Sequence, residues 1–133
     1  MNVAIEMHDS ACVAVEVNTE GQGFVLLDAY VHRTEGDPGR ASGEGGLQRI
    51  RVKMGSMTVS GSVGELPAYV YKGSLTVGET IQDNMVPFPA EYSEAVRLKM
   101  MLSDDARVVV VCGSGASIDA EGEFRFVELF DPA

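Results

Sequence analysis

The stretch R-I-R-V-K-M-G-S-M-T-V-S-G-S, residues 49–62, alternates between polar and apolar side chains over most of its length. A period of two residues is typical of β-strands that rest one face on a hydrophobic core. Gly55-Ser56, at its centre, fits a two-residue hairpin turn. Pairing about this turn predicts three pairs on the apolar face: Met54 with Met57, Val52 with Val59, and Ile50 with Gly61.

Strand-like runs of the same kind recur along the chain between turns rich in Gly and Asp. They span residues 3–17, 24–33, 68–78 and 123–130, and residues 96–113 predict a second hairpin that turns at Asp104-Asp105. Two prolines exclude a central strand from residues 79–95, where residues 89–95 fit one helical turn. The sequence therefore predicts a single all-β domain over residues 1–133 with about eight or nine antiparallel strands and little helix. A barrel-like sheet is favoured because closure removes exposed edges, and a β-sandwich is the alternative.

Size and composition limit the class of protein. The chain has 133 residues, 45% of them hydrophobic, which suits a real core and excludes a disordered chain. Its longest apolar runs, such as residues 108–112, are far too short to cross a bilayer. Residues 1–17 carry acids and lack the basic segment and cleavage site of a signal peptide. We therefore expect a cytoplasmic protein that does not associate with a membrane.

The charge is strongly negative and unevenly distributed. A net charge of −10 would be repelled by a phosphate backbone, so nucleic acid is not an expected partner. Residues 47–77 are the exception, since they carry one acid, Glu65, against four bases. The basic strand within them, with Arg49, Arg51 and Lys53 on one face, either pairs with acidic neighbours on the same sheet face or forms an anion-binding stripe.

Two cysteines, Cys12 and Cys112, lie far apart in the sequence in strand-like apolar runs. In a reducing compartment we expect both to be buried free thiols. Two cysteines alone cannot form a zinc site, and the chain has no H-x-H or H-E-x-x-H pattern. The sequence therefore predicts no metal and no cofactor.

Both histidines of the chain fall on the first two predicted strands. A hairpin centred near Glu20-Gly21, if it continued regularly, would place Asp9 about opposite His32 and His8 about opposite Arg33. Ser10 and Tyr30 would fall nearby. The candidate ligand-binding or polar cluster is therefore His8, Asp9, Ser10, Tyr30, His32 and Arg33.

Three interpretations of this cluster remain open. In the first, Asp9 accepts hydrogen bonds and holds a bend between strands. In the second, the cluster orients a small polar or anionic ligand. In the third it is chemically active, with Ser10 as nucleophile, His32 as base and Asp9 or Asp28 orienting the imidazole. No G-x-S-x-G elbow supports the third interpretation, and a metal site of His8, Asp9 and His32 lacks a ligand motif.

The loop T-E-G-D-P-G-R-A-S-G-E-G-G, residues 34–46, is long for a connection in a compact domain. It lacks the lysine and the following helix of a phosphate-binding P-loop, and it lacks the spacing of an EF-hand. We expect a surface connection, or a lid or partner contact.

Seven methionines include Met54 and Met57, which the predicted hairpin places face to face. Core packing is the expected role of this pair. A soft pocket for an apolar ligand inside a small barrel is the alternative.

The segments M-H-D-S-A-C-V-A-V-E-V, residues 7–17, and A-Y-V-H-R, residues 29–33, resemble a group of small bacterial proteins. These proteins open with an H-D-S strand followed by a β-hairpin, and they include cargo of mobile elements such as integron gene cassettes. The resemblance covers about the first third of the chain. It implies an all-β fold and no assigned activity, so no residue role follows from it.

Three functions are compatible with these features. The first is a non-enzymatic binding module for a small molecule or a protein partner. The second is a hydrolase-like enzyme that uses His8, Asp9, Ser10 and His32. The third is a homo-oligomeric structural or interaction protein assembled through strand edges or the basic strand.

Overall fold

A computed structural model describes residues 1–103 and 107–131 and shows twelve strands and no helix in that part of the chain. The all-β prediction is therefore confirmed. Three long strands come first: β1 (Asn2–Val17), β2 (Gly23–Thr34) and β3 (Gly43–Gly55). The shorter strands are β4 (Thr58–Gly61), β5 (Ala68–Val77), β6 (Thr80–Asp83), β7 (Met85–Pro87), β8 (Ala90–Tyr92), β9 (Val96–Leu102), β10 (Arg107–Gly113), β11 (Gly115–Ala120) and β12 (Arg125–Phe130).

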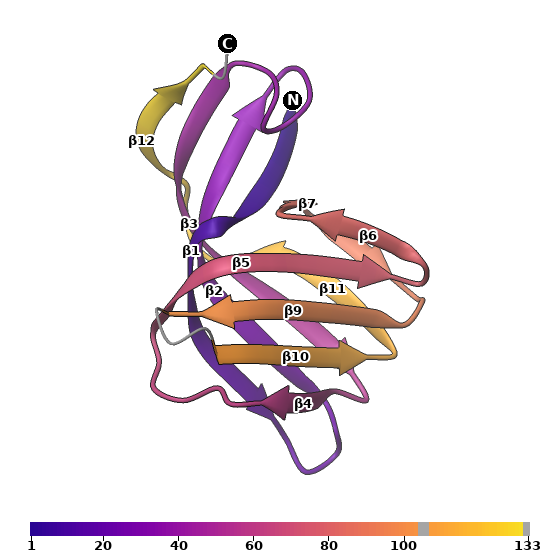
Figure 1. Ribbon diagram of the computed structural model, residues 1–133. Helices are drawn as coiled ribbons and strands as arrows, with labels where there is room; N and C mark the ends of the chain where they lie inside the picture. The colour runs from indigo at the N-terminus through magenta and orange to yellow at the C-terminus, as the bar shows by residue number, and fades with distance from the viewer. Residues whose placement is uncertain (104–106, 132–133) are drawn as a thin grey trace.

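The strands form one antiparallel, strongly curled sheet of barrel-like shape. Nine strands follow one path in the order β4-β10-β9-β5-β1-β2-β3-β11-β8. Off this path, β12 pairs with β3, β6 with β5, and β7 with β1. Figure 1 shows the lower halves of β1, β2 and β3 lying across from β5, β9 and β10, while their upper halves extend beyond this body, with β12 alongside.

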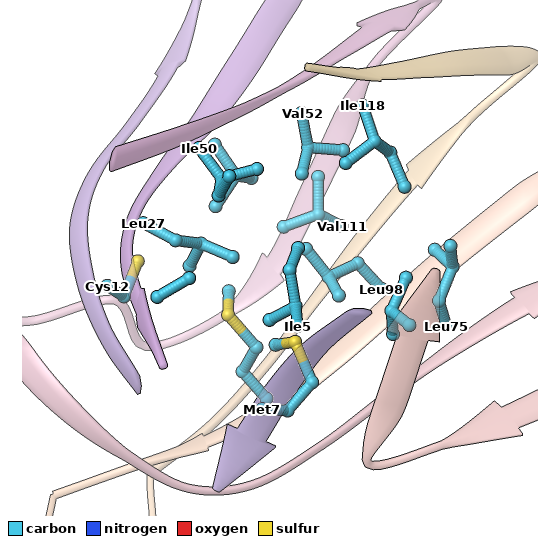
Figure 2. Packing of buried hydrophobic residues seen from close by; sticks show 14 of the residues in the cluster. Ile5, Met7, Cys12, Leu27, Ile50, Val52, Leu75, Leu98, Val111 and Ile118 are labelled. Carbon is cyan, nitrogen blue, oxygen red and sulfur yellow. The ribbon is translucent and has the colours of Figure 1, made fainter. Parts of the chain in front are cut away.

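The interior of the curled sheet is filled by its own side chains. On β2 the alternating residues Val25, Leu27, Ala29 and Val31 are all buried, as the period-two pattern requires. Figure 2 shows side chains from opposite walls of the sheet, such as Leu27 and Val111, meeting in one core. Met54 and Met57 are both buried in this cluster, so the expectation of core packing for the methionine pair is confirmed.

The predicted hairpin at residues 49–62 is wrong in its pairing. β3 pairs with β2 and β11, whereas β4 pairs with β10, so that Val59 lies opposite Val111. The alternation still assigned the faces of β3 correctly, since Ile50, Val52 and Met54 are buried. The reason lies at the turn, where only Ser56 has a positive φ (47°) and Gly55 does not. A two-residue hairpin turn needs a positive φ at its first central residue, so the chain instead crosses to the opposite wall.

The second hairpin, residues 96–113, is confirmed by the pairing of β9 with β10, in which Leu98 lies opposite Val111. Its turn at Asp104-Asp105 lies outside the described residues. The helical turn expected at residues 89–95 is wrong, because Ala90–Tyr92 form β8 and pair with β11. The expected loop 34–46 is shorter than predicted, since β2 runs to Thr34 and β3 begins at Gly43.

The basic strand pairs with acidic side chains on its own face. The Nε atom of Arg49 donates to Asp28 at 2.6 Å, and Arg51 donates through two nitrogens to Glu121 at 2.7 and 2.8 Å. The Arg51 guanidinium also stacks over the Phe24 ring at 4.0 Å. The expectation that the basic strand pairs with acidic neighbours is therefore confirmed for Arg49 and Arg51.

Cys12 and Cys112 are both free, as expected. The expected burial is confirmed for Cys12 and is wrong for Cys112, which is half-buried. Burial raises the pKa of the Cys12 thiol from 9.0 to about 11, because a thiolate would lose its hydration in the core.

This shift predicts a loss of stability in alkali. Between pH 9 and 11 the unfolded chain releases the Cys12 proton while the folded chain keeps it, so the free energy of unfolding falls as the pH rises. Over this pH interval, we expect the free energy of unfolding to fall by about 2–3 kcal/mol less in the Cys12→Ala variant than in the wild type. Urea unfolding at several pH values measures both slopes, and comparing slopes removes the effect of altered packing. Equal slopes would contradict the prediction.

Candidate binding face at the kink of strand β1

The candidate site is built around a sharp irregularity in β1. Glu6 lies opposite Tyr30, but the next pair is Ala11 with Asp28, so residues 7–10 span a single residue of β2. Asp9, inside this bulge, has a positive φ of 77°, a conformation that aspartate tolerates better than most residues. The kink marks a change of partner, because β1 pairs with β7 before it, at Ala4 to Glu6, and with β5 after it, at Ala11 and Cys12.

Ser10 joins the two sides of the kink. Its side chain is buried, its Oγ donates to the Glu6 carbonyl oxygen at 2.6 Å, and it accepts from the Tyr30 amide at 2.9 Å. The hydroxyl proton is thus committed to a backbone carbonyl. No histidine among residues 1–103 and 107–131 hydrogen-bonds to Ser10, so the geometry of an activated nucleophile is absent from this part of the chain.

His8 and Asp9 project outward beside two tyrosines of β5. His8 Nδ1 donates to the Tyr71 carbonyl oxygen at 2.9 Å, and Tyr69 Oη donates to Asp9 Oδ1 at 2.9 Å. His8 Nε2 lies 3.5 Å from the same carboxylate oxygen. The His8 ring stands edge-on to Tyr69 and Tyr71, with ring centroids 5.8 and 6.2 Å away. We call His8, Asp9, Tyr69 and Tyr71 the kink face.

His32 occupies a different environment from His8. It is completely buried, with its ring edge-on to Tyr30 at 5.3 Å and to Phe130 of β12 at 4.6 Å. Its Nε2 lies 3.1 Å from Oε1 of Glu6, while its Nδ1 has no hydrogen-bond partner in the described part of the protein. His32 is therefore a buried, carboxylate-paired imidazole beneath Glu6.

The structure does not bring the two histidines together as the regular hairpin would have done. His32 lies opposite Ala4, and Arg33 lies opposite Val3 and stacks over the Phe124 ring at 4.6 Å. The expected pairs of Asp9 with His32 and His8 with Arg33 are wrong because two bulges in β1, at residues 7–10 and at residue 13, shift the register. Within the expected cluster the structure instead forms the bond from Tyr30 to Ser10, the contact of His8 with Asp9 and the ring contact of Tyr30 with His32.

Carboxylates surround both tyrosines that flank the kink. Tyr30 Oη donates to Glu128 of β12, and burial followed by the charges of Glu128, Glu6 and Asp9 raises the Tyr30 pKa strongly. The Tyr69 pKa is also raised, first by burial and then by its bond to Asp9, with a smaller contribution from Glu6. Each negative charge disfavours the phenolate, so both phenols stay protonated donors at neutral pH.

The sequence interpretation missed Glu6, Tyr69, Tyr71 and Glu128. Tyr69 and Tyr71 alternate with the buried residues Ala68 and Val70. This alternation indicates that both aromatic rings lie on the outer face of β5. That pattern was a usable signal, because exposed aromatic rings on a small domain mark interaction surfaces. Glu6 and Glu128 gave no local signal, since they meet Tyr30 only through the pairing of distant strands.

The fold and the kink face define an all-β protein with a preorganised outer surface. No family model, no curated protein and no solved structure matched the chain. In the described ranges, no helix is long and apolar enough to span a membrane. Over the same residues, no group of three or more His, Cys, Asp or Glu side chains is arranged to hold a metal ion.

Proposed function

We propose that the protein is a non-enzymatic binding module that recognises a protein partner through the kink face. One observation carries this proposal: four exposed side chains capable of specific contacts lie together, and hydrogen bonds hold three of them, His8, Asp9 and Tyr69, in place. The side chains of His8 and Asp9 are 47% and 51% exposed, and Tyr69 and Tyr71 are 42% and 60% exposed. Their hydrogen bonds tie β1 to β5 in a fixed arrangement.

Such a surface is suited to recognition of another protein. Tyrosine offers a large contact area with few rotatable bonds and a hydroxyl for a hydrogen bond, so it dominates many protein interfaces. The backbone amide of His8 donates to Asn84 Oδ1 at 2.8 Å, which anchors the kink from a third segment. A face that is already ordered loses little conformational entropy when a partner binds.

Two further observations support binding on the outside over the alternatives. The interior is occupied by its own side chains, which favours an external site over a ligand inside the barrel (Figure 2). The raised pKa of Tyr69 makes its phenol a poor nucleophile, and the Ser10 hydroxyl is bonded to a backbone carbonyl. Both features favour a binding role over hydrolysis.

Selection from a random peptide library displayed on phage tests this proposal. We expect selected peptides to bind the wild type and to lose at least about tenfold in affinity for the Tyr69→Ala, Tyr71→Ala double variant, because truncating central aromatic anchors costs more than about 1–2 kcal/mol. Fluorescence anisotropy with labelled peptides measures both affinities.

The control variant is Val17→Ala, which truncates an exposed apolar side chain at the far end of β1, eight residues from Asp9. It should bind the selected peptides as the wild type does. Peptides that bind the double variant and the wild type equally would overturn the proposal, provided that circular dichroism shows both variants folded.

A further inference from the structure

The chemistry of the surface around the kink indicates which kind of partner it accepts. Three carboxylates lie there: Glu6 on β1, Asp9 at the kink and Glu128 on β12. Asp9 bonds Tyr69, Glu128 bonds Tyr30, and Glu6 lies opposite Tyr30 in the sheet. Glu6 and Asp9 each influence the ionisation of both phenols, so the five groups share one electrostatic neighbourhood. We call Glu6, Asp9, Glu128, Tyr30 and Tyr69 the acidic-aromatic face.

Each of these carboxylates uses only one of its oxygens in hydrogen bonds among the described residues. Oε1 of Glu6 is bonded to His32, Oδ1 of Asp9 to Tyr69, and Oε1 of Glu128 to Tyr30. These bonds hold the carboxylates in position. Within the described residues the second oxygen of each group has no hydrogen-bond partner, so three oriented acceptors remain for a ligand.

In the part of the chain that the structure describes, no lysine or arginine forms an ion pair with this face. Over residues 1–103 and 107–131, the nitrogen atoms within 4.0 Å of the Glu6 and Asp9 carboxylates as possible ion-pair partners belong to histidines, and Glu128 has no such partner. The arginine pairs of the same ranges lie elsewhere, between Arg49 and Asp28 and between Arg51 and Glu121. In a chain of net charge −10 this local charge adds to a field that attracts cations.

A buried group beneath this face also has a polar atom without a partner among the described residues. Nε2 of His32 lies 3.1 Å from Oε1 of Glu6, so one ring nitrogen is held by a carboxylate of this face. Nδ1 is buried without a partner in the part of the chain that the structure describes. A buried imidazole nitrogen without a partner is unusual, so the polar groups of this cluster are incompletely satisfied both at its surface and beneath it.

We propose that the acidic-aromatic face binds an arginine-bearing segment of the protein partner. Guanidinium groups donate to the free oxygens of Glu6, Asp9 and Glu128 and stack on the exposed rings of Tyr69 and Tyr71. A guanidinium supplies five N–H donors and no acceptor, and it stacks on aromatic faces, so it complements a face rich in acceptors and rings. The inference rests on the proposed function, because it names the partner chemistry of that same surface.

A direct test uses a fluorescein-labelled peptide of alternating glycine and arginine and measures its anisotropy with the wild-type protein. Replacing arginine by citrulline, which is neutral and of similar shape, is expected to weaken binding by about tenfold or more. The double variant Asp9→Asn, Glu128→Gln should bind the arginine peptide more weakly than the wild type does, by a similar factor. Asparagine also tolerates the left-handed conformation at position 9, so the kink is preserved.

The matched control is the double variant Glu79→Gln, Glu91→Gln, which removes the same amount of charge from exposed positions elsewhere. It should bind the arginine peptide within about twofold of the wild type. An equal loss in both double variants would mean attraction by net charge alone and would overturn the inference. Equal binding of the citrulline and arginine peptides, or no binding of the arginine peptide, would also overturn it.

The peptide library separates this inference from the proposed function. Peptides that depend on Tyr69 and Tyr71 but lack basic residues would refute the arginine partner and leave the binding module standing. Selected peptides that are indifferent to both tyrosines would refute the binding module itself. Arginine-rich peptides that depend on the tyrosines and on Asp9 and Glu128 would support both.

Discussion

The Ser10→Ala variant should lose about 2–4 kcal/mol of unfolding free energy, although only one oxygen atom is removed. That oxygen belongs to a buried side chain, and its hydroxyl donates to the Glu6 carbonyl and accepts from the Tyr30 amide in part-buried hydrogen bonds. Without it, two backbone groups at the kink lose their partner, and each unsatisfied buried group costs about 1–3 kcal/mol. Urea unfolding followed by circular dichroism measures the difference.

Ser93→Ala is the matched control, because Ser93 is exposed and forms no side-chain hydrogen bond within the described ranges. Its unfolding free energy should stay within about 0.5 kcal/mol of the wild type. A loss for Ser10→Ala as small as that of the control would mean that the hydroxyl is not structural. The possibility that Ser10 is a nucleophile would then deserve renewed study.

The second large effect is expected in the core. Leu27 lies on β2, is 1% exposed and packs beside Ile50 and Cys12 in Figure 2. Leu27→Ala should lower the free energy of unfolding by about 2–5 kcal/mol, because it removes buried apolar atoms and leaves a cavity. Because two hydrogen-bonded neighbours, β1 and β3, hold β2 in place, we expect the backbone to relax little around the cavity.

Leu27→Met, which nearly conserves side-chain volume, is the companion variant and should cost less than about 1.5 kcal/mol. Together the two variants test whether the interior is a packed core or a soft ligand pocket. A packed core is sensitive to lost volume. If Leu27→Ala were as stable as Leu27→Met, the interior would tolerate empty space, and ligand binding inside the barrel would regain support.

The buried and exposed parts of the candidate site depend on each other. Ser10 holds the kink closed, and His32 holds one oxygen of Glu6. Above them, the kink turns His8 and Asp9 outward against Tyr69 and Tyr71. A binding face on a flexible loop would need to be ordered by its partner, whereas this one is built on strands and supported from below. For this reason we expect substitution of Tyr69 and Tyr71 to reduce peptide binding, and substitution of Ser10 to reduce the stability of the fold.

Local sequence determined the strand-forming character of the chain and much of which side chains face the core. The alternation in residues 49–54 placed Ile50, Val52 and Met54 inside and the basic residues outside, and the structure agrees. The sequence also indicated the hairpin of β9 and β10, because two apolar runs lie close together along the chain. These features depend on a two-residue alternation of side chains and on a short distance along the chain between paired strands, and both can be read from the sequence.

Only the tertiary structure decided which strands pair and which polar residues meet. Faces are fixed by alternation, but the choice of partner for β4 depended on a turn conformation and on the distant strand β10. The expected cluster of two histidines was wrong because two bulges in β1 changed the register, and a shift of even one residue changes which side chains are neighbours. The surroundings of Tyr30 come from β1 and β12, which lie at opposite ends of the sequence. No local pattern encodes such a contact, because it exists only once the sheet has curled and brought the ends of the chain together.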